Sequence, residues 1–188
     1  KGRVRVNGEV IKKADIKVRI PGDTVTLDGE EVAYAVMEYY MLNKPQGVVS
    51  ATEDKKYPTV LDLIADKKRK DLSPKKHVDK VYYARCRGTV REGAAEEFAR
   101  GIHLPDGLLC LPAELTVLSY DRIQDESEIR LRIREGKFHQ VKRMMEAVGC
   151  PVFFLKRLSM GPLVLDENLK PGEYRPLTDT EREWLEQL

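Results

Sequence analysis

The chain has 188 residues, which is enough for one large domain or two small ones with a hydrophobic core. Lys and Arg total 33 against 31 Asp and Glu, so the net charge of +2 does not by itself indicate a nucleic-acid-binding protein. Three widely spaced cysteines fit neither a zinc motif nor a disulfide framework, and no apolar run is long enough to span a bilayer. We therefore expect reduced thiols, no metal, no secretory leader, no membrane partner and a cytoplasmic location.

Positive charge is concentrated in three segments. Residues 1–20 carry seven basic and two acidic side chains, residues 66–80 carry seven and three, and residues 130–143 carry six and one. The last ten residues instead carry four acidic side chains and one basic one. This distribution indicates a basic face on a nearly neutral protein, which favours a polyanionic partner such as RNA.

The first 31 residues predict a small basic β-unit. Residues 3–10 alternate around Asn7-Gly8, a strong hairpin signal, and a further strand over residues 24–27 is closed by Asp28-Gly29. Such a unit is too short to form a core alone. The segments G-R-V-R-V-N-G-E-V-I and P-G-D-T-V-T-L-D-G resemble the second half of the alpha-L RNA-binding motif, with a plain hairpin as the alternative. The resemblance implies a partial alpha-L RNA-binding domain over residues 1–31, a linker over residues 32–38 and RNA contacts by Arg3, Arg5, Asn7, Lys12 and Lys13.

Residues 39–50 predict two strands separated by a sharp break. Lys44-Pro45 favours an extended residue followed by a fixed φ, and Gly47 permits a tight turn. The motif L-N-K-P-x-G resembles the first signature of the RsuA-type ribosomal RNA pseudouridine synthases, and Y-P-T-V-L-D-L-I at residues 57–64 is similar to the same family. The resemblance extends through the following segments and implies a catalytic domain over residues 39–188.

One signature of that family is absent. Its members attack uridine with an aspartate in a G-R-L-D-x-x-T-x-G-L signature, which belongs between residues 57–64 and residues 73–83 here. No G-R-L-D occurs in the chain. Either the protein has lost its nucleophile, or a stretch is omitted from the sequence near Asp71–Ser73. We favour an omission, because deleting a strand and a helix from a packed sheet costs more than the ~5–15 kcal/mol stability of a domain. An omission predicts consecutive Cα atoms there much farther apart than the ~3.8 Å of a trans peptide.

The segment S-P-K-K-H-V-D-K-V-Y-Y, residues 73–83, resembles the part of the family that carries its active-site tyrosine. The resemblance implies that Tyr82 stacks on a flipped uridine and acts near the proton-transfer step. Without the resemblance, a core aromatic is the simpler interpretation. We expect Lys75 and Lys76 in this segment to hold phosphates, as we expect of Lys44.

Residues 129–149 predict a strand, a turn and a helix. Ile129, Leu131 and Ile133 alternate with arginines, and the apolar residues then fall at positions 141, 144, 145 and 148. We expect the cationic groups to converge where the strand ends and the helix begins, which suits a polyanion; a solvated sheet edge explains them equally well. R-E-G-K-F-H-Q-V-K-R-M-M resembles the basic signature beside the family's catalytic pocket. The resemblance implies that Lys142 pairs with the missing aspartate, that His139 and Gln140 brace the turn, and that these residues contact RNA: Arg130, Arg132, Arg134, Lys137, His139, Gln140 and Arg143.

The remaining segments predict supporting structure. We expect a helix over residues 91–101, a strand over residues 114–120, a buried strand over residues 150–156, and a terminal helix opened by a capping box at Thr178. L-K-R-L-S-M-G-P-L-V-L and L-K-P-G-E-Y-R-P-L-T are similar to the family's last strands. Strands joined mostly by hairpins, with few helices, predict an α+β fold with a largely antiparallel or mixed sheet and a small N-terminal β-unit.

The resemblance implies a pseudouridine synthase, an isomerase that acts on one uridine of ribosomal RNA, with small-subunit RNA favoured. It implies no cofactor, and we expect a monomer whose partner is ribosomal RNA. The alternative is a non-catalytic RNA-binding or ribosome-assembly protein on the same scaffold, which explains the basic segments and the missing aspartate together. Release of tritium from labelled uridine RNA distinguishes the two.

Overall fold

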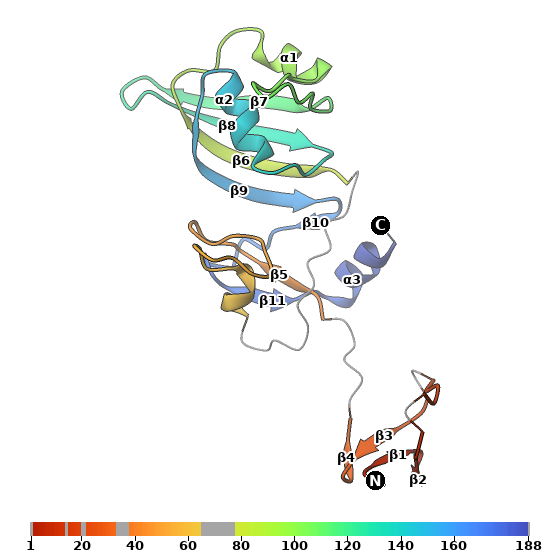
Figure 1. Ribbon diagram of the computed structural model, residues 1–188. Helices are drawn as coiled ribbons and strands as arrows, with labels where there is room; N and C mark the ends of the chain where they lie inside the picture. The colour runs from red at the N-terminus through yellow and green to blue at the C-terminus, as the bar shows by residue number, and fades with distance from the viewer. Residues whose placement is uncertain (1, 14, 20–21, 33–37, 65–77, 188) are drawn as a thin grey trace. The chain divides into compact units, whose positions relative to one another are not determined.

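The computed structural model describes residues 2–13, 15–19, 22–32, 38–64 and 78–187 (Figure 1). The chain divides into two compact units, residues 1–38 and residues 39–188. The segment around Asp71–Ser73, where we expect a break in Cα spacing, lies outside the described residues. None of the helices in the described ranges is long and apolar enough to cross a membrane.

The first unit is a four-stranded antiparallel sheet in the order β2-β1-β3-β4. Its strands are β1 (Val4–Val6), β2 (Glu9–Val10), β3 (Val25–Leu27) and β4 (Glu30–Glu31). Asn7 and Gly8 both have positive φ, 50° and 86°, as a tight two-residue hairpin turn requires, so the predicted hairpin is confirmed. None of the described residues of this unit is buried, which agrees with the expectation that it has no core of its own.

The second unit contains a five-stranded antiparallel sheet in the order β10-β9-β6-β8-β7 (Figure 1). Its strands are β6 (Lys80–Arg87), β7 (Glu114–Asp121), β8 (Glu126–Ile133), β9 (Val152–Met160) and β10 (Leu163–Val164). β6 is central and pairs with β8 on one side and β9 on the other. β9 was expected over residues 150–156 as a buried strand; it runs farther, and none of its residues is fully buried because it lies near the edge that only the short β10 covers.

The core lies between one face of this sheet and two helices. Helix α1 (Ala94–Arg100) contributes Phe98, and helix α2 (Gln140–Ala147) contributes Met144 and Met145, all fully buried. From β8 come Ile129, Leu131 and Ile133, so the predicted alternation along the strand and the predicted stripe along the helix are both confirmed. Both helices therefore cover the same face of the sheet, the face that carries the apolar residues of β8.

The remaining elements form a smaller layer. β5 (Tyr40–Leu42) pairs with β11 (Tyr174–Pro176), and a 3₁₀ turn, η1, spans Val60–Leu63. The strand expected after the Pro-x-Gly break is wrong: Val49 forms only an isolated bridge to Thr59. Helix α3 (Asp179–Glu186) begins with the predicted capping box, in which Thr178 Oγ1 accepts from Glu181 N at 3.2 Å. The architecture is the predicted α+β fold with antiparallel sheets and few helices.

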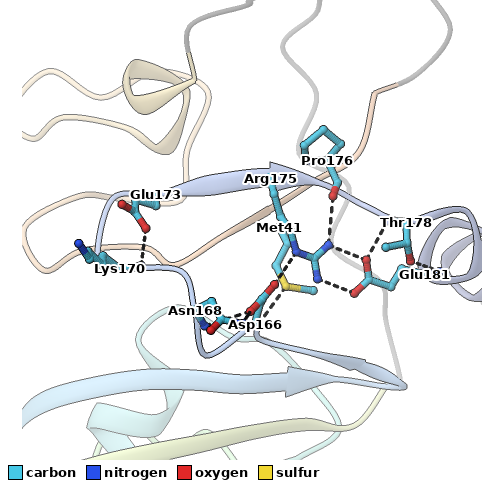
Figure 2. A network of polar contacts seen from close by, with 9 residues as sticks. All are labelled: Met41, Asp166, Asn168, Lys170, Glu173, Arg175, Pro176, Thr178 and Glu181. Atoms are coloured by element: carbon cyan, nitrogen blue, oxygen red, sulfur yellow. Dashed lines mark hydrogen bonds and ion pairs between the residues drawn. The ribbon is translucent and has the colours of Figure 1, made fainter.

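Arg175 joins three of these segments (Figure 2). Its Nε donates to Asp166 Oδ2 at 2.8 Å, and Nη1 and Nη2 donate to the two carboxylate oxygens of Glu181 at 2.8 and 2.9 Å. Asp166 is itself held by Asn168, whose backbone and side-chain nitrogens both donate to Oδ1 at 3.0 Å. One guanidinium on β11 thus anchors α3 and the turn before β11.

Candidate active site

Tyr82 lies on the core face of the sheet, on the central strand. It is paired with Leu131 of β8 and Arg157 of β9, and its partly buried side chain contacts the hydrophobic core. Because directly paired residues of an antiparallel ladder project on the same side, Tyr82 shares its face with Leu131, beneath the helices. A register shift between Val81 and Tyr82 marks the position where β9 departs from a regular ladder. Such irregularities redirect side chains near functional sites.

Four cationic side chains gather around this end of the sheet. Burial lowers the pKa of Lys44, and the nearby charges of Lys142 and Arg157 lower it further. Burial likewise lowers the pKa of Lys80, with a further contribution from Arg157 that is opposed by Asp79. We call Lys44, Lys80, Lys142 and Arg157 the cation cluster. Like charges near one another create a positive potential that favours a bound anion.

The ammonium groups of Lys44 and Lys80 are positioned by backbone carbonyls. Lys44 Nζ donates to Val48 O at 2.7 Å and to Pro45 O at 3.1 Å, so the Pro-x-Gly loop wraps around its own lysine. Lys80 is buried, and its Nζ donates to Val78 O at 2.9 Å. The stem of Lys80 runs beneath the turn before α2, because its Cε lies 4.0 Å from where a Cβ on Gly136 would stand.

The turn between β8 and α2 is braced by Glu135 and Gln140. Gln140 Nε2 donates to Glu135 Oε1 at 2.6 Å, and Gln140 Oε1 accepts from Lys137 N at 3.0 Å. Glu135 also accepts from Leu111 N at 2.9 Å and pairs with Lys137 at 3.0 Å. Burial raises the pKa of Glu135, but these hydrogen bonds and the charge of Lys137 outweigh it and leave the pKa lowered. Gln140 thus has the bracing position predicted for it, and Lys137 has Glu135 as an acidic partner.

The arginines of β8 do not converge with Lys142. Arg130 is paired with Tyr83 and Arg132 with Val81, so both project on the face opposite to Tyr82. The predicted convergence is therefore wrong for these two residues, because the helix packs on the apolar side of the strand and the guanidiniums occupy the other side. Arg132 lies 3.3 Å from Glu114, whereas Arg130 forms no ion pair within residues 38–64 and 78–187.

Two other predicted RNA contacts in this region have acidic partners. Arg134 Nε lies 3.2 Å from Asp79 Oδ1, an ion pair without hydrogen-bond geometry, since that oxygen has no hydrogen-bond partner. Arg143 pairs with Asp106. Lys142, in contrast, is exposed and forms no ion pair with any residue that the structure describes. Lys75 and Lys76 lie outside the described residues.

In the first unit, the predicted RNA contacts differ in how strongly they are held. Arg3 Nε donates to Asp28 Oδ1 at 2.8 Å, and Asn7 secures a loop, accepting from Thr24 N and donating to Asp23 Oδ1, both at 2.9 Å. Arg5, Lys12 and Lys13 are exposed on the same small unit. The structure therefore gives Asn7 a role in holding the loop, whether or not it also contacts RNA.

The sequence indicated Lys80 only as the end of a basic run over residues 67–80 and gave no indication of Arg157. Lys80 stands two residues before Tyr82, so strand periodicity alone places both side chains on one face, and this signal was available. No such signal identifies Arg157, because its proximity to Tyr82 depends on the register of β9 against β6. Within the described part of the chain, no group of three or more His, Cys, Asp or Glu side chains is placed to hold a metal ion.

No family model matches the chain. An RNA pseudouridine synthase of Bacillus subtilis is 39% identical over 96% of this chain and 86% of its own length. The small-subunit pseudouridine synthases A of Salmonella typhimurium and Escherichia coli are 38% and 36% identical over 95% of this chain and 87% of theirs. The crystal structure of a pseudouridylate synthase superposes with a TM-score of 0.66 at 32% identity, covering 97% of this chain and 88% of that one.

The alignment with the Bacillus protein also has more positions than this chain has residues. It extends over 210 positions, whereas the chain has 188 residues, so the relative contains residues with no counterpart here. The relatives cover both units, their names agree, and the solved structure shares the fold at 32% identity. The chain belongs to the RNA pseudouridine synthase family.

Proposed function

We propose that this protein isomerises one uridine of small-subunit ribosomal RNA to pseudouridine, acting as a monomer in the cytoplasm. The observation that carries the proposal is the cation cluster around Tyr82, in a chain whose relatives include small-subunit pseudouridine synthases. The reaction needs an extruded base, an aromatic surface for it and a stabilised carboxylate, and the first unit adds basic surface for RNA.

The reaction breaks the bond from N1 of uracil to C1′ of the sugar and forms a bond from C5 to C1′. The hydrogen on C5 leaves as a proton, and N1 gains one, so no oxidant or cofactor is needed. In this scheme Tyr82 stacks on the uracil ring and its hydroxyl acts near the proton transfer. Lys142 has no ion-pair partner among the described residues, and it pairs with the nucleophilic carboxylate and keeps it ionised.

The carboxylate itself comes, in this proposal, from a segment belonging near Asp71–Ser73. The surplus of alignment positions in the Bacillus relative supports such a segment, because residues present in that enzyme are absent here. The non-catalytic alternative requires a family member that has kept the cation cluster but lost the nucleophilic carboxylate that would bind there. Nothing in the comparisons favours that alternative.

For the remaining predicted contacts, we propose that twelve cationic side chains hold phosphates of the RNA on both units. They are Arg3, Arg5, Lys12, Lys13, Lys44, Lys75, Lys76, Arg130, Arg132, Arg134, Lys137 and Arg143. Residues 1–31 then form a partial alpha-L RNA-binding domain, joined through residues 32–38 to the catalytic domain over residues 39–188. Contacts to phosphate set affinity and its salt dependence rather than the choice of uridine.

The test combines sequencing of the gene with turnover of labelled RNA. The gene is sequenced between the codons of Ile64 and Val78, and the expressed protein is incubated with small-subunit RNA containing [5-³H]uridine. We expect a G-R-L-D codon run and tritium released to water, with release abolished when that aspartate is changed to asparagine. An unbroken gene without the run, combined with tight RNA binding and no tritium release, assigns the protein to the non-catalytic class.

A further inference from the structure

An aromatic pair is exposed at the start of α2. Phe138 is 77% exposed, and its ring stacks on that of His139 with centroids 3.9 Å apart and planes inclined by 22°. Leaving a phenyl ring in water forgoes about 1.5–3 kcal/mol of burial energy, so an exposed ring held by a neighbour is a candidate contact surface. His139 covers one face of the ring, and the opposite face is available to a ligand.

The backbone on both sides of Phe138 is fixed. Lys137 N donates to Gln140 Oε1 at 3.0 Å, and His139 adopts the left-handed conformation with φ of 47° as the residue that precedes α2. His139 O accepts the helical hydrogen bond from Arg143 N at 3.0 Å. This conformation costs free energy in a residue other than glycine, and it persists because the surrounding loop fixes the backbone. The backbone that carries the aromatic pair is therefore ordered before a ligand binds.

The surroundings of the pair favour a nucleotide over a protein partner. Lys142 follows in the first turn of α2 and forms no ion pair among the described residues, and its charge belongs to the cation cluster. An exposed ring next in sequence to a basic helix start presents a stacking surface within a positive potential that attracts RNA, and proteins bind unpaired bases through this combination. A protein partner needs a wider apolar area than one ring provides.

We propose that Phe138 stacks on an unpaired base of the RNA that neighbours the uridine taken into the site. The proposal rests on the proposed function, since that function makes RNA the ligand and Lys142 part of the site. Phe138 then contributes to substrate binding and not to the bond-breaking step. Its contribution depends on the presence of a planar ring at position 138 and of a base on the RNA.

The test measures binding of the full chain to two probes by fluorescence anisotropy. One probe is a 5′-fluorescein-labelled 12-nucleotide oligouridylate, and the other has the same backbone with abasic positions throughout. We expect Phe138→Leu to weaken binding of the oligouridylate about 5- to 100-fold, and Phe138→Tyr to stay within about threefold of the wild type. All three proteins are expected to bind the abasic probe equally, because no base remains to stack.

Ile123→Ser is the matched control. Ile123 is 97% exposed in the turn between β7 and β8, so the variant removes an exposed apolar side chain that is not part of the site. Its binding should equal that of the wild type. Equal oligouridylate binding by the wild type and Phe138→Leu overturns the proposal, as does an equal loss on both probes.

Tritium release separates this proposal from the proposed function. If the wild type releases tritium and Phe138→Leu binds and turns over RNA normally, the proposed function stands and the stacking role of Phe138 is refuted. If the wild type releases no tritium but Phe138→Leu still shows weaker binding that depends on the bases, the stacking role stands and the proposed enzymatic function is refuted. For an active wild type, we expect Phe138→Leu to raise KM with kcat within about twofold.

Discussion

The ammonium groups of Lys44 and Lys142 lie close enough to repel each other, although one belongs to the loop after β5 and the other to α2. Burial is the main cause of the lowered pKa of Lys44, and this repulsion adds to it. Two elements far apart in the sequence therefore bring like charges to one place at an energetic cost. An anion bound between them removes that cost, which links the fold to a negatively charged group at the site.

The first prediction concerns Lys142. Lys142→Met should lower kcat for tritium release about 10²- to 10³-fold, because the nucleophilic carboxylate loses the cation that keeps it ionised. Lys142 is exposed, so the thermal midpoint should change by less than about 2 °C. Arg182→Met serves as the control, since Arg182 on α3 pairs only with the exposed Asp179 among described residues. Comparable kcat values for both variants contradict the assigned role.

The second prediction separates the ring of Tyr82 from its hydroxyl. Tyr82→Phe should keep KM within about threefold and lower kcat about 10²-fold, because stacking survives and proton transfer does not. Tyr82→Leu should lower kcat further and raise KM. Steady-state tritium release at saturating and limiting RNA gives both constants. A Tyr82→Phe variant with wild-type kcat limits Tyr82 to stacking alone.

The third prediction follows from the position of Arg130 on the opposite face of the sheet from Tyr82. Arg130→Gln should leave kcat unchanged within about twofold, because the sheet separates the guanidinium from the reacting base. Loss of one phosphate contact should instead reduce the slope of log affinity against log salt by about 0.7–0.9. Filter binding at several salt concentrations provides the slope. A large fall in kcat would place Arg130 at the reacting centre, contrary to its pairing with Tyr83.

Local patterns in the sequence were sufficient to predict several individual helices, strands and turns. The alternation from Ile129 to Ile133 identified a strand with one apolar face, and the spacing of Met144 and Met145 identified the helix that covers it. Asn7-Gly8 likewise identified a hairpin, because few other pairs adopt positive φ at both positions. Each of these signals depends on residues within one turn or one strand of each other.

Those patterns did not predict how the strands pair or which distant side chains come into contact. Periodicity shows that Arg130 and Leu131 face opposite ways, but only the pairing of β6 with β8 shows which of them shares a face with Tyr82. Arg157 enters the site through the register of β9, which includes two irregularities that no local pattern indicates. The acidic partners of Arg132 and Arg134 come from segments distant in the sequence, so their ion pairs could not be predicted from the local sequence.

The fourth prediction concerns Arg175 and the stability of the second unit. Arg175→Met removes the donor shared by Asp166 and Glu181, whose side chains are only 23% and 14% exposed. Two partly buried carboxylates then lose their cationic partner, so the free energy of unfolding should fall by about 1–3 kcal/mol. The fluorescence of Trp184, the single tryptophan and a residue of α3, follows the transition in urea. Arg182→Met, at a more exposed ion pair, should change stability by less than about 0.5 kcal/mol.

The fifth prediction is the pH dependence that Glu181 adds to the same region. Hydrogen bonds from Arg175 are the main cause that lowers the pKa of Glu181 from 4.5 to about 2. A carboxyl whose pKa is lower in the folded state stabilises the fold above its unfolded pKa, and this contribution is lost as the pH falls from about 4.5 towards 2. We therefore expect the urea midpoint followed by Trp184 to decrease over this range. Glu181→Gln keeps a hydrogen-bonding side chain but cannot titrate, so it should be less stable at pH 7 and lose stability less steeply below pH 4.5. An unchanged acid slope in Glu181→Gln would assign the loss to other carboxyls, of which Asp166 is the first candidate because its hydrogen bond with Arg175 also lowers its pKa.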